Sequence, residues 1–242
     1  MKVLVIPDIH LKPWIFDRAE DIMKAGKAER AVCLMDIPDD FGMERNLLIY
    51  EQTFDRAIAW AKAYPDTLWC YGNHDVSYPW RMDETGYSKI AEGLVVMKLR
   101  ELEKSLADES RIAMIHRIGK VLFMHGGLSN LFVRWQDEKY LKAEIDEVIE
   151  MVNHAPQKEL WSNYSPLWFR PQYDKTKMFR TKEFKQVVGH TPVEKIYEEN
   201  GVISTDVFST YPDGRQIGES AMIVIDTETG EYEKVAVEGK PE

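Results

Sequence analysis

Short apolar runs alternate with helix-like patterns in the first third of the chain. Residues 2–6, 31–35 and 67–71 are apolar runs, and each is followed by a turn-forming or acidic residue. Residues 16–28 and 47–63 lie between these runs and place apolar side chains at the spacing of one helical face. Because strands that alternate with helices form βαβ units, this pattern predicts a parallel sheet.

The middle of the chain mixes helical and strand-like patterns. Residues 84–105 and 137–152 predict two further amphipathic helices. The apolar runs 111–115 and 120–124 flank residues 116–119, which predicts a hairpin whose turn contains His116.

The last third of the chain is richer in strands. Residues 155–184 predict an irregular segment with many aromatic residues and prolines. Four strand-like pieces follow, at residues 186–188, 202–205, 221–225 and 232–237. Residues 227–230 predict the turn between the last two strands, and the tail 239–242 is expected to fray. We predict one domain over residues 1–242, with two facing sheets and helices outside them. A single mixed doubly wound sheet is the alternative.

Side chains that can bind metals directly follow five of the predicted strands. In chain order they are Asp8 with His10, Asp36, Asn73 with His74, His125, and His190. Most of these positions alone would be interpreted as polar turns, whereas residues 72–75 alone fit a loop and a functional site equally well. Together they indicate a site, because ligands of α/β sheets bind at the carboxyl ends of strands. The other two histidines, His116 and His154, receive no role.

Composition narrows the possible partners and the compartment. The formal charge is −10, from 31 basic and 41 acidic residues, which argues against non-specific binding to nucleic acids or anionic membranes. Cys33 and Cys70 lie in apolar runs and are expected to be buried thiols in a reducing compartment. The sequence contains neither a signal-peptide pattern nor an apolar run of about 20 residues, so we predict a cytoplasmic protein.

The ordered motifs Asp-x-His, Asp-x-x-Asp, Gly-Asn-His-Asp, His-Gly-Gly and Gly-His-Thr-Pro resemble those of the calcineurin-like metallophosphoesterases. Residues 125–129 (HGGLS) and 167–171 (LWFRP) are similar to the phosphoprotein-phosphatase branch, which includes bacterial serine/threonine phosphatases and symmetrical diadenosine-tetraphosphate hydrolases. The motifs cover about three quarters of the chain. The resemblance implies a four-layer α/β/β/α sandwich of two mixed sheets flanked by helices.

The resemblance also implies a pair of divalent metals. Their ligands would be Asp8, His10, Asp36, Asn73, His125 and His190. Asp8 and His10 would bind the first metal, Asp36 would bridge both metals, and the others would complete the second site. Carboxylate, imidazole and amide ligands favour Mn²⁺, with Fe or Zn²⁺ as alternatives. A hydroxide shared by the two metals would attack the phosphorus directly.

Further roles implied by the resemblance concern proton transfer and phosphate binding. His74 would protonate the leaving group, and Asp39 would orient its ring. Arg170 and Asn73 would bind the phosphate. The chain departs from the family at Asp40, which stands where a phosphate-binding arginine is expected. Arg45 and Arg180 are the candidates that could replace that arginine.

Three functions are compatible with these motifs. The first is hydrolysis of phosphate monoesters, in phosphoproteins or small phosphorylated molecules. The second is hydrolysis of dinucleoside polyphosphates or phosphodiesters, since aromatic rings could stack on a base. The rings in question are Trp161, Tyr164, Trp168, Phe169 and Tyr173, for which core packing is the alternative interpretation. The third is an inactive binding module on the same fold.

Overall fold

The computed structural model describes residues 1–238, so the predicted frayed tail 239–242 lies outside the described residues. The first of two mixed sheets has the strand order β11-β10-β1-β2-β3-β4. Its strands are β1 (Lys2–Ile6), β2 (Arg30–Cys33), β3 (Leu68–Cys70), β4 (Ile112–Ala113), β10 (Ala221–Asp226) and β11 (Tyr232–Ala236). Strands β1 to β4 run parallel, whereas β10 and β11 pair antiparallel at the β1 edge.

The second sheet has the strand order β5-β6-β7-β9-β8. Its strands are β5 (Ile115–Ile118), β6 (Val121–Met124), β7 (Lys185–Val188), β8 (Tyr197–Glu199) and β9 (Val202–Ser204). Strands β6, β7 and β9 are parallel, and β5 and β8 pair antiparallel at the two edges. The existence of two sheets rules out the alternative of one doubly wound sheet.

The predicted hairpin turn at residues 116–119 is wrong. Residues 115–118 form β5, where His116 pairs with Phe123, and the chain turns at Gly119 and Lys120. Gly119 has a φ of +56°, which favours glycine in the turn. His116 is buried, and its ring Nε2–H donates to the backbone oxygen of Trp69 in β3 over 3.0 Å. This bond links the two sheets.

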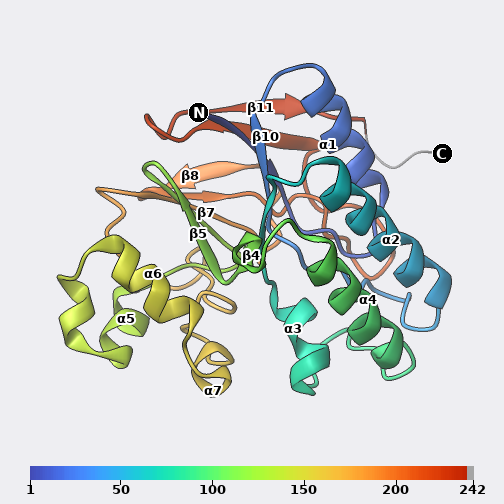
Figure 1. The fold of residues 1–242 in the computed structure, drawn as a ribbon, viewed down its shortest axis with the longest axis horizontal. Coiled ribbons are helices and arrows are strands. Elements are labelled where there is room, and N and C mark those ends of the chain that lie inside the picture. Colours follow the sequence, from blue (N-terminus) through green and yellow to red (C-terminus); the bar gives the residue numbers. More distant parts are fainter. Residues whose placement is uncertain (239–242) are drawn as a thin grey trace.

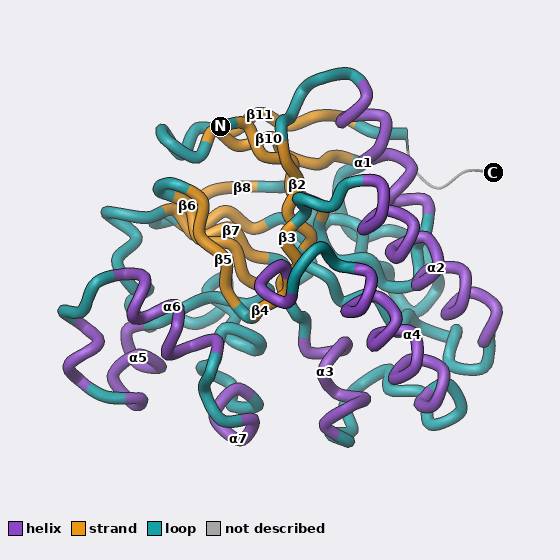
Figure 2. Tube along the Cα trace, in the orientation of Figure 1, coloured by secondary structure: helices purple, strands orange, loops and turns teal. Residues whose placement is uncertain are grey.

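Helices flank both sheets, as predicted. The first sheet is covered by α1 (Trp14–Lys24), α2 (Leu47–Ala63) and α4 (Glu92–Ser105), and α3 (Asn73–Trp80) begins directly after β3. On the other side of the molecule lie α5 (Asn130–Gln136), α6 (Ile145–Asn153) and α7 (Gln157–Leu160), as Figure 1 shows in green and yellow. Short 3₁₀ turns occupy Glu109–Arg111 and Glu138–Leu141. Figure 2 shows the teal loops that join these helices and strands on all sides of the molecule.

One helix has the predicted boundaries, and two others differ from the predictions near glycines. The helix α2 has the predicted bounds, and Asn46 caps it by accepting from the backbone N–H of Ile49. The helix α1 ends near Gly26, which has a φ of +68°. The predicted helix 84–105 begins only at residue 92, because a loop with Gly86 at a φ of +89° precedes it.

Buried apolar residues form two clusters. The larger one surrounds the first sheet and includes Val121, Phe123 and Val187 from the facing sheet, so it fills the space between the sheets. The smaller one lies between the second sheet, α5, α6 and the irregular segment 155–184. Cys33 and Cys70 are buried free thiols, as predicted. Within the described residues, no helix is both long and apolar enough to cross a membrane.

Candidate metal centre

The two sheets bring six strand ends to one place. Strands β1, β2 and β3 of the first sheet run parallel, as do β6, β7 and β9 of the second. The side chains that follow these strands are Asp8 and His10, Asp36, Asn73 and His74, His125, His190, and Asp206. The structure therefore brings together all the residues predicted to bind metals, and it adds Asp206.

The backbone at this edge is unusual. His10, Asp36, Asp39 and His190 have φ values of +42°, +44°, +67° and +62°, a region that residues other than glycine rarely adopt. Such conformations cost of order 1–3 kcal/mol each and cluster at functional sites. Their occurrence at four predicted site residues supports a functional role for these loops.

Two glycines make room for two carboxylates. A Cβ atom on Gly72 would lie 1.9 Å from Oδ1 of Asp36, and one on Gly189 would lie 1.9 Å from Oδ1 of Asp8. These glycines precede Asn73 and His190 in the motifs. The motifs therefore contain glycine because a carboxylate occupies the space of its side chain.

Asp75 fixes the loops after β2 and β3 to each other. Its carboxylate accepts the backbone N–H groups of Asp36 (2.8 Å), Ile37 (3.0 Å) and Gly72 (2.9 Å). Burial, together with the charge of Asp36, raises the pKa of Asp75 to about 7. One carboxylate thus positions both Asp36 and the start of α3.

One group of donor atoms surrounds His125. Its Nε2 lies 3.0 Å from Oδ2 of Asp36, 3.0 Å from Oδ1 of Asn73 and 3.2 Å from Nδ1 of His190. Asp36, His125 and His190 are all buried, and their ligand atoms lie within 4.8 Å of one another. The convergence of carboxylate, amide and imidazole donors on one point is the geometry of a metal site.

The opposite ring nitrogens of the histidines are held by backbone carbonyls. Nδ1–H of His125 donates to the oxygen of Leu34 (3.1 Å), and Nε2–H of His190 donates to that of Trp168 (3.1 Å). His10 donates from Nδ1 to the oxygen of Asp39 (2.9 Å). These bonds select the tautomer whose other nitrogen faces the carboxylates with a lone pair, as metal-binding histidines require.

A second group contains Asp206, which the sequence analysis missed. Ligand atoms of Asp8, His10 and Asp206 lie within 4.8 Å of one another, and those of His10, Asp36 and His74 form a further group of the same size. Asp206 accepts from the backbone and hydroxyl of Ser209. The signal was available, since Asp206 follows the predicted strand 202–205 directly.

The buried charge fits divalent cations. Asp8 and Asp206 are both buried, and Oδ1 of Asp8 has no hydrogen-bond partner among the described residues. Burial, followed by the charge of Asp206, raises the pKa of Asp8, and burial raises the pKa of Asp206. Neighbouring buried carboxylates are stable in the charged form only beside cations, and this set of oxygen and nitrogen donors suits a divalent metal.

His74 and Asp39 form the predicted pair. Nδ1 of His74 lies 2.9 Å from Oδ2 of Asp39, whose other oxygen accepts the hydroxyls of Tyr50 and Tyr78. Burial alone would lower the pKa of His74, but the charge of Asp36 and the bond to Asp39 outweigh it and raise this pKa to about 10. The ring is therefore cationic at neutral pH and can donate a proton.

Glu84 is a second residue that the sequence analysis missed. Its Oε2 accepts from the amide of Asn73 and lies 3.7 Å from Nε2 of His74. Burial raises the pKa of Glu84 to about 7. No strand end precedes Glu84, which lies in the loop after α3, so the sequence offered no signal for it.

The charge reversal at Asp40 is compensated in a way that the sequence analysis did not foresee. Asp40 accepts from Nζ of Lys12 (2.8 Å) and from the hydroxyl of Thr210 (2.5 Å). Arg45 and Arg180 are not among the described residues that line the cavity, so neither candidate replaces the missing arginine.

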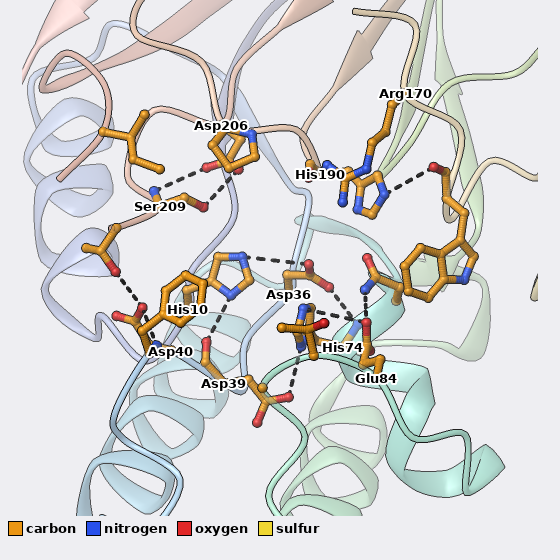
Figure 3. A pocket seen from close by; sticks show the side chains of 18 of the residues that line it. His10, Asp36, Asp39, Asp40, His74, Glu84, Arg170, His190, Asp206 and Ser209 are labelled. Atoms are coloured by element: carbon orange, nitrogen blue, oxygen red, sulfur yellow. Dashed lines mark hydrogen bonds and ion pairs between the residues drawn. The ribbon is translucent and has the colours of Figure 1, made fainter. Parts of the chain in front are cut away.

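Arg170 lines the cavity, as expected for a phosphate-binding residue. Its guanidinium donates to the backbone oxygen of His190 (2.8 Å) and contacts the hydroxyl of Thr191 (3.3 Å). Figure 3 shows Arg170 beside His190, and His10, Asp36 and His74 around the centre of the cavity.

The cavity has a volume of about 720 Å³. Of the five aromatic residues considered for base stacking, Trp161 and Trp168 line it. Phe169 is buried in the smaller core cluster, and Tyr164 packs against that cluster. Tyr173 is 74% exposed and lines a different cleft. Core packing is therefore confirmed for Phe169 and Tyr164, and stacking on a base stays a prediction for Trp161 and Trp168.

Comparison with known proteins gives two results. A family model described as calcineurin-like phosphoesterase matches residues 1–212. Among solved structures, the cold-active protein-tyrosine phosphatase of a psychrophilic Shewanella species is similar, with a TM-score of 0.54 and 18% identity over 96% of this chain and 80% of that one. A phosphoesterase from E. coli aligns with a TM-score of 0.41 and 13% identity over 98% of this chain and 100% of that one. No curated protein matches.

Proposed function

The chain belongs to the calcineurin-like phosphoesterase family and is a metal-dependent phosphoric ester hydrolase, and we propose that within this class it hydrolyses phosphate monoesters at a pair of metals. The observation that carries the proposal is the position of Asp36. Its carboxylate belongs to two groups of potential ligands, and its Oδ1 accepts the backbone N–H of His74 over 3.0 Å. A shared carboxylate next to a cationic imidazole fits hydrolysis with a protonated leaving group.

The ligands divide between two metals. Asp8 and His10 would hold the first metal, and the proximity of Asp206 to both supports it as an additional ligand there. Asn73, His125 and His190 would hold the second metal, as their converging donor atoms suggest. This mixture of carboxylate, amide and imidazole favours Mn²⁺, with Fe or Zn²⁺ as alternatives. When bound, the metals supply the Lewis acidity that activates water and polarises the phosphoryl group.

The chain's own side chains perform the remaining steps. The guanidinium of Arg170 binds the phosphate oxygens, and Asn73 contributes its amide at the same place. His74 donates the proton from Nε2 to the leaving oxygen, because its Nδ1 is occupied by Asp39. Asp39 is in turn fixed by two tyrosine hydroxyls, which keeps the ring in one orientation.

A second candidate is hydrolysis of dinucleoside polyphosphates or phosphodiesters. The observation in its favour is that Trp161 and Trp168 line the cavity, where they could stack on a base. The Shewanella structure is named as a protein-tyrosine phosphatase, so phosphotyrosine peptides are one monoester class to include in the test.

The test compares substrates on protein that has been stripped of metal and reloaded with Mn²⁺. The substrates are p-nitrophenyl phosphate, a phosphopeptide, bis-p-nitrophenyl phosphate and diadenosine tetraphosphate, with Asp36→Asn as the blank. We expect metal-dependent turnover of the monoesters that disappears in the blank. A preference for diadenosine tetraphosphate would favour the second candidate. Two bound metals without any turnover would favour an inactive module, and absence of bound metal would refute the proposal.

A further inference from the structure

The lining of the cavity is strongly acidic. The carboxylates that line it belong to Asp36, Asp39, Asp40, Asp83, Glu84 and Asp206. Among the described lining residues, Arg170 is the one lysine or arginine. A substrate therefore meets one guanidinium or ammonium group from the protein, besides the imidazole of His74 and the metals of the proposed centre.

Five of these carboxylates fall into three kinds. Asp36 and Asp206 belong to the ligand groups, and Asp39 is paired with His74. Asp40 and Asp83 are paired with lysines, Lys12 at 2.8 Å and Lys89 at 3.5 Å.

Glu84 differs from the other carboxylates of the lining. Its side chain is 6% exposed, and its Oε1 has no hydrogen-bond partner among the described residues. A carboxylate with one unpartnered oxygen therefore lies beside His74, where the leaving group of the proposed reaction must lie.

Four aromatic residues also line the cavity. Trp161 and Trp168 meet edge to face, with ring centroids 5.0 Å apart. Trp168 in turn packs edge to face on the ring of His190 at 5.5 Å, so this pair lies next to a proposed ligand. Phe41 and Tyr211 also line the cavity, and they remain 47% and 40% exposed. Exposed rings at the edge of a cavity offer apolar surface to a ligand.

We propose that this cavity selects phosphate monoesters whose leaving group is aromatic and carries a positive charge or none, and that it rejects substrates with additional phosphates or carboxylates. The inference rests on the proposed phosphomonoesterase function. One phosphate is matched by the metals and Arg170. A second anionic group would face an acidic lining whose one lysine or arginine, Arg170, already binds the first phosphate, whereas an ammonium group would be attracted to the carboxylates and the rings.

The experiment uses three aryl phosphates that differ in one charge. They are 4-ethylphenyl phosphate, phosphotyramine and phosphorylated 3-(4-hydroxyphenyl)propionate, which are neutral, cationic and anionic at the para substituent. Because the substituent is separated from the ring by methylenes, the leaving phenols have nearly equal acidity. Glycerol 3-phosphate provides a leaving group without a ring, and diadenosine tetraphosphate provides additional phosphates.

With Mn²⁺-loaded enzyme, we expect phosphotyramine to have a kcat/KM equal to or above that of 4-ethylphenyl phosphate. The propionate and diadenosine tetraphosphate should both be at least tenfold poorer. Glu84→Gln should reduce the ratio between the cationic and anionic substrates severalfold. The ratio is informative even if the variant is slower overall, because a general loss of activity lowers kcat/KM for both substrates equally and cancels in their ratio.

The aromatic lining is tested independently of Glu84. Phe41→Ala combined with Tyr211→Ala should raise KM for the neutral aryl phosphate severalfold and leave KM for glycerol 3-phosphate unchanged. Tyr173→Ala is the matched control, since this exposed tyrosine lies outside the cavity. Equal rates on the cationic and anionic substrates, efficient cleavage of diadenosine tetraphosphate, or an unchanged KM would overturn the selectivity alone. Failure to hydrolyse any monoester would contradict the proposed function itself.

Discussion

The two sheets contribute to the centre by the same geometry but with different chemistry. The first sheet supplies Asp8, Asp36 and the pair of Asn73 and His74 from loops after parallel strands. The second sheet supplies two buried imidazoles and Asp206 from equivalent positions. The proposed proton donor, His74, lies on the first side. In the proposed function, metal binding is therefore shared between the sheets, whereas proton donation depends on one of them.

Replacing one histidine on each side should separate these two contributions. We expect His74→Asn to lower kcat by about 10²–10⁴ while both metals remain bound, because it removes acid catalysis alone. His125→Asn should also lower kcat, but through loss of the second metal. Steady-state kinetics and metal content by mass spectrometry on the same samples distinguish the two. Loss of metal in His74→Asn would show that this histidine is a ligand and not the proton donor.

The glycines before Asn73 and His190 allow a test of packing on each side. Gly72→Ala and Gly189→Ala should each lower the free energy of unfolding by about 1–3 kcal/mol, since the new Cβ would collide with a buried carboxylate. Urea unfolding of the metal-free protein measures this. Gly93→Ala in α4 is the control, because nothing lies within 4 Å of its Cβ position, and it should be neutral or stabilising. Equal effects in all three variants would contradict the crowding argument.

Asp206→Asn should weaken binding of one metal by about 10–100-fold and leave the other unaffected, as for a residue that completes one site. Calorimetric titration with Mn²⁺ would resolve the two events. Asp40→Asn is the matched control, because this carboxylate is bound to Lys12 and Thr210 and belongs to neither ligand group. If both variants weaken Mn²⁺ binding equally, Asp206 acts only through its contribution to the total charge of the site and is not a ligand.

The smallest expected effect concerns His116, whose hydrogen bond to Trp69 links the two sheets. Burial lowers the pKa of His116 to about 4, from an unfolded value near 6.5, so the unfolded state binds the proton more tightly. Stability is therefore lost as pH falls from 6.5 towards 4. Between pH 7 and 5.5 this loss amounts to about 1 kcal/mol. His116→Gln should lack this component, which urea unfolding at both pH values would reveal as a smaller difference between them. An identical pH dependence would mean that His116 is not buried as the neutral form.

The convergence of the proposed ligands was predicted better from the sequence than their surroundings were. Ligand positions such as Asp36 and His125 follow from strand ends, and strand ends are local signals. The bond between Lys12 and Asp40 spans 28 positions, and the contact of Glu84 with Asn73 depends on the path of a loop. Nothing in local periodicity encodes such contacts. The hairpin turn was misplaced because His116 was interpreted as a polar turn residue, whereas the bond to Trp69 allows it to lie in a buried strand.

Asp75 has a consequence for how this centre can change over evolution. Because its carboxylate joins the loop of Asp36 to the loop of Asn73, a mutation that shifts either loop is transmitted to both. The positions of the two loops therefore depend on each other, and we expect single substitutions within them to be poorly tolerated. Phe41 and Tyr211 are not among the residues that Asp75 binds. We therefore expect natural variation and directed evolution to change substrate preference through substitutions at those two positions, while the loops of Asp36 and Asn73 stay constant.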